Sequence, residues 1–242
     1  MNLIEVSDLH VRYGDYEAVK GVSFTLGAGE ILGIVGESGS GKSTIAKTLM
    51  GLEKPSGGHI AICRSSMQMI FQDAVGSLNP RMTVRQTLSE CLKVSKFRSL
   101  RVDSRTFKPS NSQTPQGLLD LVGLSSAVLD QYPREMSGGQ CQRVSVARAL
   151  ACEPEVLIAD EPVSALDVSV QARILNLLRD LRRDLGLSIL LIAHDLAVVK
   201  NVCDRICVME HGLFVDAGDA EEVFDHPTSE YTKRLLSAVP RI

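Results

Sequence analysis

The sequence predicts an α/β domain built on a mostly parallel sheet. Three runs are apolar almost throughout, as expected of strands buried on both faces of such a sheet, at residues 31–35, 156–159 and 187–193. Apolar residues at spacings of three and four over residues 170–185 predict an amphipathic helix between two of these strands. Strands that alternate with helices along a chain indicate a parallel sheet. The 242 residues are enough to bury one large core of this kind.

Composition argues against several other classes of protein. Aromatic residues make up 4% of the chain and tryptophan is absent, so stacking platforms for single-stranded nucleic acid are not expected. A net charge of −3 argues against a basic face, and no nucleic-acid partner is expected. The longest strongly apolar run, residues 189–193, is far shorter than the roughly 20 residues that a membrane-spanning helix needs. Residues 1–5 lack the basic and apolar regions of a signal peptide.

The six cysteines are scattered and contain no C-x-x-C pair. A disulfide framework or a zinc site is therefore not expected, and we expect reduced thiols in a cytosolic protein.

Local patterns place the remaining elements of the core. Alternation over residues 3–11 predicts a strand that ends in a turn, and a second strand is expected over residues 22–26. A helix is expected from about residue 42 to residue 50, after a glycine-rich loop. Asp167 is the expected N-cap of the amphipathic helix, and Gly186 is its expected end. Two short strands, over residues 205–209 and 213–215, and two short helices complete the chain.

The middle of the chain, from about residue 74 to residue 151, is expected to be a helical insertion. It contains predicted helices over residues 117–122 and 140–152. Polar residues dominate between residues 95 and 115, and residues 93–108 carry six basic side chains against one acidic side chain. This composition favours a solvated loop over a binding patch.

A glycine-rich loop between the first buried strand and the next helix predicts a phosphate-binding site. Residues 36–44 fit the pattern G-x-x-x-x-G-K-[ST] in its required context. Backbone N–H groups of such a loop turn toward phosphate oxygens, and the helix N-terminus adds partial positive charge. Lys42 is expected to reach the β- and γ-phosphates, and the Ser43 hydroxyl to ligate Mg²⁺. The residues expected to contact the nucleotide here are Gly36, Glu37, Ser38, Gly39, Ser40, Gly41, Lys42, Ser43 and Thr44.

Two adjacent carboxylates end the buried strand at residues 156–159. Open α/β sheets bind ligands at the carboxyl ends of their strands, so Asp160 and Glu161 are candidates for the same site. Asp160 is expected to hold the Mg²⁺ shell, in part through water, because Mg²⁺ keeps several of its waters. Glu161 is the candidate general base for the attacking water.

A second anion cradle is expected at residues 136–140, where a serine and two glycines precede an amphipathic helix. The cradle residues are Ser137, Gly138, Gly139 and Gln140. One nucleoside triphosphate does not obviously need two cradles, so we expect the second to serve the nucleotide of another subunit.

Three further residues lie next to these motifs. His194 follows a buried strand, where a neutral imidazole could hydrogen-bond the γ-phosphate or the attacking water. Gln72 follows three apolar residues and is a candidate sensor and ligand of Mg²⁺ and of the attacking water. Tyr13 precedes a turn ahead of the first core strand, a place that favours stacking on adenine.

Taken in order, these motifs resemble those of the ATP-binding subunit of an ABC transporter. Residues 36–44 correspond to the family's Walker A motif, residues 156–161 to its Walker B motif with the catalytic glutamate, and residues 136–140 to its LSGGQ signature. In the same comparison, Gln72 matches the Q-loop and residues 164–167 match the D-loop. His194 and Tyr13 then correspond to the switch histidine and the adenine-stacking aromatic.

The resemblance implies a RecA-like P-loop NTPase fold with an N-terminal antiparallel β-subdomain and an inserted α-helical subdomain. It implies a single ABC ATPase domain over residues 1–242. Residues 1–73 and 152–242 would form the nucleotide-binding core, and residues 74–151 would form the helical subdomain with the signature. The implied catalytic residues are Glu161, His194 and Gln72, and the implied Mg²⁺ ligands are Ser43, Gln72 and Asp160.

Finer strings narrow the resemblance to one subgroup. Residues 77–81, 161–169 and 226–240 are similar to the F-type subunit of dipeptide, oligopeptide and nickel permeases. This similarity implies a Mg²⁺-dependent ATPase that drives an importer of peptides or nickel from the cytoplasmic side of the membrane. Its implied partners are a second, related ATPase in a heterodimer, transmembrane permease subunits and, indirectly, a substrate-binding protein.

A second interpretation is a soluble ABC-type ATPase of an enzyme assembly, such as a phosphonate lyase complex. Only thirteen residues separate Gly58 from Gln72, fewer than in most relatives of the permease subgroup, which leaves room for this alternative. Met136 stands where the family usually has leucine, and Cys141 where a polar residue is commoner. The chain also lacks the cysteine-bearing tail of some permease ATPases, so no iron–sulfur cluster is expected.

Overall fold

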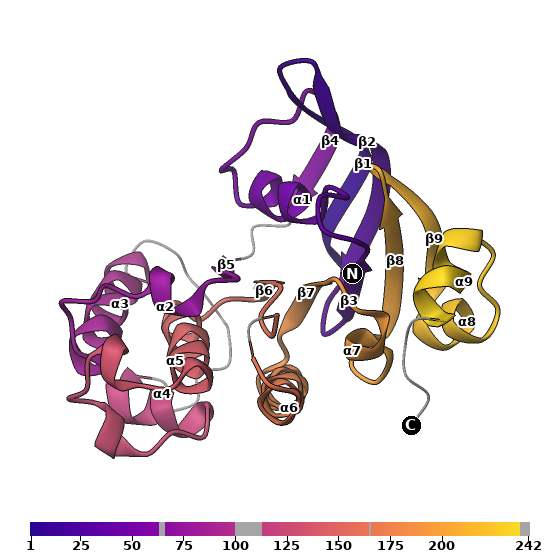
Figure 1. The fold of residues 1–242 in the computed structure, drawn as a ribbon. Helices are drawn as coiled ribbons and strands as arrows, with labels where there is room; N and C mark the ends of the chain where they lie inside the picture. Colours follow the sequence, from indigo (N-terminus) through magenta and orange to yellow (C-terminus); the bar gives the residue numbers. More distant parts are fainter. Residues whose placement is uncertain (63–65, 100–112, 165, 238–242) are drawn as a thin grey trace.

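The strands form two sheets in a computed structural model that describes residues 1–62, 66–99, 113–164 and 166–237 (Figure 1). A three-stranded antiparallel sheet has the order β2-β1-β4, and a six-stranded sheet has the order β5-β6-β7-β3-β8-β9. Only β9 runs antiparallel to its neighbour in the larger sheet. The strands are β1 (Asn2–Tyr13), β2 (Tyr16–Gly27), β3 (Ile31–Val35), β4 (Gly57–Ile62), β5 (Met67–Ile70), β6 (Val156–Asp160), β7 (Ser188–Ala193), β8 (Arg205–Glu210) and β9 (Leu213–Asp219).

Helices cover both faces and both ends of the six-stranded sheet. The helices α2 to α5 gather beyond the β5 edge, whereas α8 and α9 lie beside β9 (Figure 1). The helices are α1 (Lys42–Leu49), α2 (Ala74–Ser77), α3 (Val84–Ser99), α4 (Pro115–Leu121), α5 (Gly138–Leu150), α6 (Val168–Leu185), α7 (Leu196–Lys200), α8 (Ala220–Asp225) and α9 (Glu230–Ser237). In the described part of the chain, no helix combines the length and the apolar character needed to cross a membrane.

Alternation along the buried strands divides the interior into two cores. In β3, Leu32 and Ile34 face the core that holds helix α1 and the small antiparallel sheet. Ile31 and Val35 face the opposite core, which contains α5, α6 and the other helices. Successive side chains of a strand point to opposite faces, so a strand covered on both sides must be apolar at every position. The parallel α/β fold predicted from these apolar runs is confirmed.

The amphipathic helix α6 begins and ends as its sequence predicts. The Asp167 carboxylate accepts a hydrogen bond from the N–H of Val170, which satisfies one of the unpaired donors of the first turn. Gly186 follows the helix in the left-handed region, with φ of 67°, where glycine carries no Cβ penalty.

Several predicted boundaries were wrong. The prediction of a polar loop from residue 95 was wrong for its first residues, because α3 continues to Ser99, and residues 100–112 of that predicted segment lie outside the described residues. Polar residues can extend a helix once Val84, Leu88 and Leu92 have anchored it at spacings of four. Strand β9 extends to Asp219 instead of residue 215, since polar residues are tolerated on an edge strand that pairs with β8 on one side only.

The packing of α6 against the sheet gives a first prediction. Leu178 is fully buried in the larger core, so Leu178→Ala should lower the free energy of unfolding by about 2–5 kcal/mol. The exposed neighbour Asn176 provides the control, and Asn176→Ala should change it by less than about 0.5 kcal/mol. Urea denaturation followed by circular dichroism measures both, and equal effects of the two substitutions would contradict the assigned face of the helix.

Candidate functional site

The glycine-rich loop connects β3 to α1 and leaves no space for side chains at two of its glycines. A Cβ on Gly36 would overlap the carbonyl oxygen of Met209, and a Cβ on Gly41 would overlap that of Ala18. Gly41 also has φ of 111°, a conformation that L-residues rarely adopt. The loop is therefore pressed against the backbone of β8 on one side and of β2 on the other.

Lys42 is buried inside this loop, with 3% of its surface exposed. Its ammonium donates to the carbonyl oxygens of Gly36 at 2.6 Å and Glu37 at 2.7 Å, and to the Ser40 hydroxyl at 3.3 Å. Burial lowers the pKa of the ammonium, while the nearby carboxylates of Glu161 and Asp160 raise it. An ammonium has three N–H donors, so the loop itself occupies all of them.

A hydrogen bond between the side chains of Ser43 and Asp160 connects α1 to the end of β6. The Ser43 hydroxyl donates to Asp160 Oδ1 at 2.9 Å, and Asp160 is 6% exposed. Burial raises the pKa of the Asp160 carboxyl, and the bond from Ser43 opposes that effect. One hydroxyl and one carboxylate side by side are a donor set that suits Mg²⁺.

The three expected catalytic residues lie together. Gln72 Nε2 donates to Glu161 Oε2 at 2.8 Å, and His194 Nδ1 lies 3.9 Å from the same oxygen. Glu161 has φ of 46°, unusual for a residue other than glycine, and its N–H donates to the carbonyl of Ile192 on β7. Backbone in such a conformation is held by its surroundings and is frequent at functional sites.

Of these groups, Lys42, Ser43, Gln72 and Glu161 line a cavity of about 400 Å³, whereas Asp160 and His194 do not line it. Its lining joins the glycine-rich loop, the first β-hairpin, Gln72 and Glu161. The described residues that line it are Tyr13, Tyr16, Ala18, Ser38, Gly39, Gly41, Lys42, Ser43, Thr44, Gln72 and Glu161. Tyr13 is 43% exposed, so its ring is available to a ligand.

The signature residues do not line this cavity. Ser137 is the N-cap of α5: its hydroxyl accepts from the N–H of Gln140, whose side chain accepts from the N–H of Ser137. A Cβ on Gly139 would lie 2.6 Å from Val170, so this glycine lets α5 approach α6 closely. Gly138 lines a neighbouring cavity of about 410 Å³ that shares only Gln72 with the first.

Sequence reasoning did not single out Tyr16, and it noted Ser164 only as the first residue of the D-loop match. Tyr16 pairs with Tyr13 across the hairpin and lines the same cavity at 59% exposure. The Ser164 hydroxyl lies 3.4 Å from Gln72 Nε2 and donates to the carbonyl of Glu161. The spacing of the two tyrosines around a Gly-Asp turn is the signal for Tyr16.

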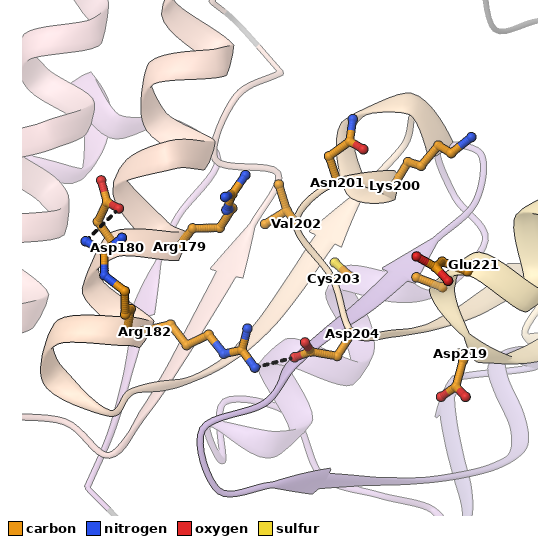
Figure 2. Close-up of a pocket in the computed structure, with 12 residues that line it drawn as sticks. Arg179, Asp180, Arg182, Lys200, Asn201, Val202, Cys203, Asp204, Asp219 and Glu221 are labelled. Carbon is orange, nitrogen blue, oxygen red and sulfur yellow. Dashed lines mark ion pairs between the residues drawn. The ribbon is translucent and has the colours of Figure 1, made fainter.

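A larger cavity, of about 930 Å³, lies at the opposite edge of the sheet (Figure 2). Asp204 precedes β8 and accepts the N–H of Ile31, the first residue of β3, so this cavity lies where the strands begin. Some of its charged residues pair with one another, as in the ion pair between Arg182 and Asp204 at 3.0 Å. Ligands of open α/β sheets bind where strands end, and the smaller cavity at the glycine-rich loop is the candidate site.

Comparison with known proteins agrees with this geometry. Residues 19–164 match the family described as "ABC transporter". The oligopeptide transport ATP-binding protein OppF of Escherichia coli K12 is 43% identical over 98% of this chain and 78% of its own. OppF of Lactococcus lactis strain IL1403 is 45% identical over 93% of this chain and 73% of its own.

Solved structures of ATP-binding cassettes share the fold. CbiO1 of Clostridium perfringens, part of the ABC transporter complex CbiONQ, has a TM-score of 0.78 at 29% identity and covers 93% of this chain and 91% of its own. The cassette MJ0796, a dimer bound to ADP and Pi, has a TM-score of 0.73 at 26% identity over 90% of this chain and 98% of its own. Because the family match and the relatives extend across the phosphate loop and both carboxylates, the chain belongs to the ABC transporter family and is an ATP-binding ATPase.

Proposed function

We propose that this chain is the ATP-hydrolysing subunit of an importer of peptides. The observation that carries the catalytic part is that Lys42, Ser43, Gln72 and Glu161 line one cavity, with Asp160 hydrogen-bonded to Ser43. Relatives named as oligopeptide transport ATP-binding proteins match at 43–45% identity, which supports peptides over nickel as the cargo. The same names favour an importer over the ATPase of a soluble enzyme assembly.

The loop would bind the triphosphate of ATP through its backbone N–H groups and Lys42. A phosphate oxygen would replace the weakest acceptor of the ammonium, the Ser40 hydroxyl at 3.3 Å, while the carbonyls of Gly36 and Glu37 keep the side chain in place. The Tyr13 ring would stack on adenine, with Tyr16 beside it.

Mg²⁺ would be held by the Ser43 hydroxyl and, in part through water, by Asp160. When bound, the ion supplies charge that stabilises the phosphate oxygens. Gln72 reaches the same region from the end of β5, so its amide can hydrogen-bond a water of the ion or the attacking water.

Glu161 would accept the proton of the attacking water. Its Oε2 receives the Gln72 amide at 2.8 Å, which fixes the carboxylate toward the cavity. His194 would bind the γ-phosphate or the attacking water, since 48% of its side chain is exposed and it lies next to Glu161. Proton acceptance, water positioning and charge stabilisation would thus come from the ends of three neighbouring strands.

The signature at Ser137, Gly138, Gly139 and Gln140 would complete the site of a second subunit. These residues form the N-terminus of α5 and do not line the cavity of their own chain. The dipole of the helix makes its N-terminus a favourable place for an anion. Two subunits related head to tail would place each ATP between Lys42 of one and Ser137 of the other, and MJ0796 forms a dimer. We propose a related ATPase as the second subunit, permease subunits in the membrane as the docking partners, and a peripheral position on its cytoplasmic side.

Replacing the proposed base should separate binding from hydrolysis. Glu161→Gln keeps the size of the side chain and leaves Lys42, Ser43 and Asp160 in place, so ATP binding should remain. Turnover should fall by about 10²- to 10⁴-fold, because the amide cannot accept the proton. The exposed Glu90 on α3 provides a matched control, and Glu90→Gln should leave phosphate release unchanged. Phosphate release by Glu161→Gln within a few-fold of the natural protein would refute the assignment.

The proposed exchange of signatures predicts complementation. When the purified chain is assembled with itself in the absence of the proposed second ATPase, the Lys42→Ala and Ser137→Arg chains should each be inactive in phosphate release, since both sites of either homodimer carry a lesion. In an equimolar mixture, mixed dimers have one site with intact Lys42 and intact Ser137 and a second site with both lesions. Partial recovery of ATPase activity on mixing is expected, whereas full activity of either variant alone would contradict the shared site.

The partners can be identified by recovery from the membranes of the native host. A tagged chain captured in mild detergent should bring down a second ABC ATPase and permease subunits, identified by mass spectrometry. The control is the same tag on an unrelated cytosolic protein. Recovery of the chain from the cytosol with an enzyme complex and without permease subunits would instead support the soluble assembly.

A further inference from the structure

The C-terminal helix α9 touches the phosphate loop. The hydroxyl oxygen of Tyr231 accepts a hydrogen bond from the N–H of Glu37 at 2.9 Å, a contact between residues 194 positions apart in the sequence. Tyr231 is 5% exposed, and its ring belongs to the larger core. The hydroxyl is therefore delivered to the loop by a side chain that the core holds in place.

The peptide group between Gly36 and Glu37 contacts both Tyr231 and Lys42. The N–H of Glu37 and the C=O of Gly36 belong to one planar trans peptide group, so they point in opposite directions. Tyr231 binds the N–H end, and the Lys42 ammonium binds the C=O end at 2.6 Å. The orientation of this one peptide group is consequently fixed from both sides, and a rotation of it would remove an acceptor from the ammonium.

Independent contacts fix α9 at this place. Asp216 on β9 accepts the backbone N–H groups of Thr228 and Ser229, which begin the turn into the helix. Although burial would raise the pKa of Asp216, these bonds and the Thr228 hydroxyl hold it below its usual value, so the anchor is ionised at neutral pH. The Arg234 guanidinium lies over the Tyr231 ring at 5.7 Å and reaches Glu210 at 3.4 Å, close to the turn beside the loop.

We propose that Tyr231 is a positioning residue for nucleotide binding, whose hydroxyl sets the Gly36–Glu37 peptide group and, through it, the ammonium of Lys42. Tyr231 does not line the nucleotide cavity, so it acts on the phosphate loop from behind. The inference extends the proposed phosphate-binding role of Lys42 to the last described helix of the chain. Docking of α9 and affinity for ATP become linked, because both depend on the same hydrogen bond.

The chemistry of the phenol suits this task. Burial raises the pKa of Tyr231, so the hydroxyl keeps its proton at neutral pH and accepts the N–H without bringing a negative charge toward the phosphates. Without the hydroxyl, a half-buried N–H would lose its partner, which favours other orientations of the peptide group. Lys42 would then lose part of its support in the ground state and in the transition state alike.

Tyr231→Phe tests the inference in the full-length chain, because it keeps the ring in the core and removes only the acceptor. The Kd and KM for Mg-ATP should rise about three- to tenfold with kcat within twofold, the pattern of a lost contact that ground and transition states share. Hydrogen exchange of the Glu37 amide should become faster in the absence of nucleotide. A structural role alone would lower the folded fraction, and so kcat, at unchanged KM.

Lys233→Ala is the matched control on the same helix, since this exposed lysine forms an ion pair with Glu230 at the helix surface. It should leave the Kd, the KM and Glu37 exchange unchanged. If Tyr231→Phe does not fold, Arg234→Leu takes its place, because it removes the cation over the same ring. Arg234→Leu should also raise the Kd, by a smaller factor. Unchanged Kd and unchanged Glu37 exchange in a folded Tyr231→Phe would overturn the inference. Failure of the natural chain to bind Mg-ATP would instead refute the proposed function.

Discussion

The contact of two glycines with two backbone carbonyls is the constraint on which the site depends. Gly36 is pressed against the carbonyl of Met209 and Gly41 against that of Ala18, so the phosphate loop is clamped between β8 of the large sheet and β2 of the small one. A side chain at either position would push the loop outward and carry Lys42 with it. The clamp also explains why the antiparallel hairpin β1–β2 belongs to the nucleotide site. The strand that supports Gly41 begins at Tyr16, which lies beside the place proposed for adenine.

Strand order brings the chemistry together. The sheet order β5-β6-β7-β3 places the ends of four parallel strands next to one another. Gln72 follows the first, Asp160 ends the second and Glu161 follows it, His194 follows the third, and the phosphate loop follows the fourth. These segments are up to 158 residues apart along the chain, from loop residue Gly36 to His194. Parallel pairing alone determines that they share one edge, and the left-handed backbone of Glu161 turns its carboxylate back toward the cavity.

Sequence reasoning could predict whatever depends on local pattern. The buried strands, the phosphate loop and the caps of α6 each leave a mark within a few residues, and all are found where that pattern puts them. The contribution of Tyr231 leaves no such mark, because it arises when a helix near residue 230 packs beside a loop near residue 37. Gly139 is a residue for which two causes would coincide: the proposed anion cradle would need a glycine there, and the approach of α5 to Val170 needs one. A single sequence cannot separate these requirements, since both demand the absence of a side chain.

Charge balance gives the site its dependence on its ligands. Burial lowers the pKa of Lys42 and raises that of Asp160, so folding has placed an ammonium and a carboxyl where each is less stable in its charged form than in water. Hydrogen bonds to the loop carbonyls offset the cost of burying the ammonium, whereas the bond from the Ser43 hydroxyl offsets the cost of burying the Asp160 carboxylate only in part. A divalent cation beside Asp160 and a triphosphate beside Lys42 would supply the missing opposite charges at once. The ion would also stabilise the phosphate oxygens of the nucleotide. Binding of the ion and binding of the nucleotide should therefore be mutually reinforcing.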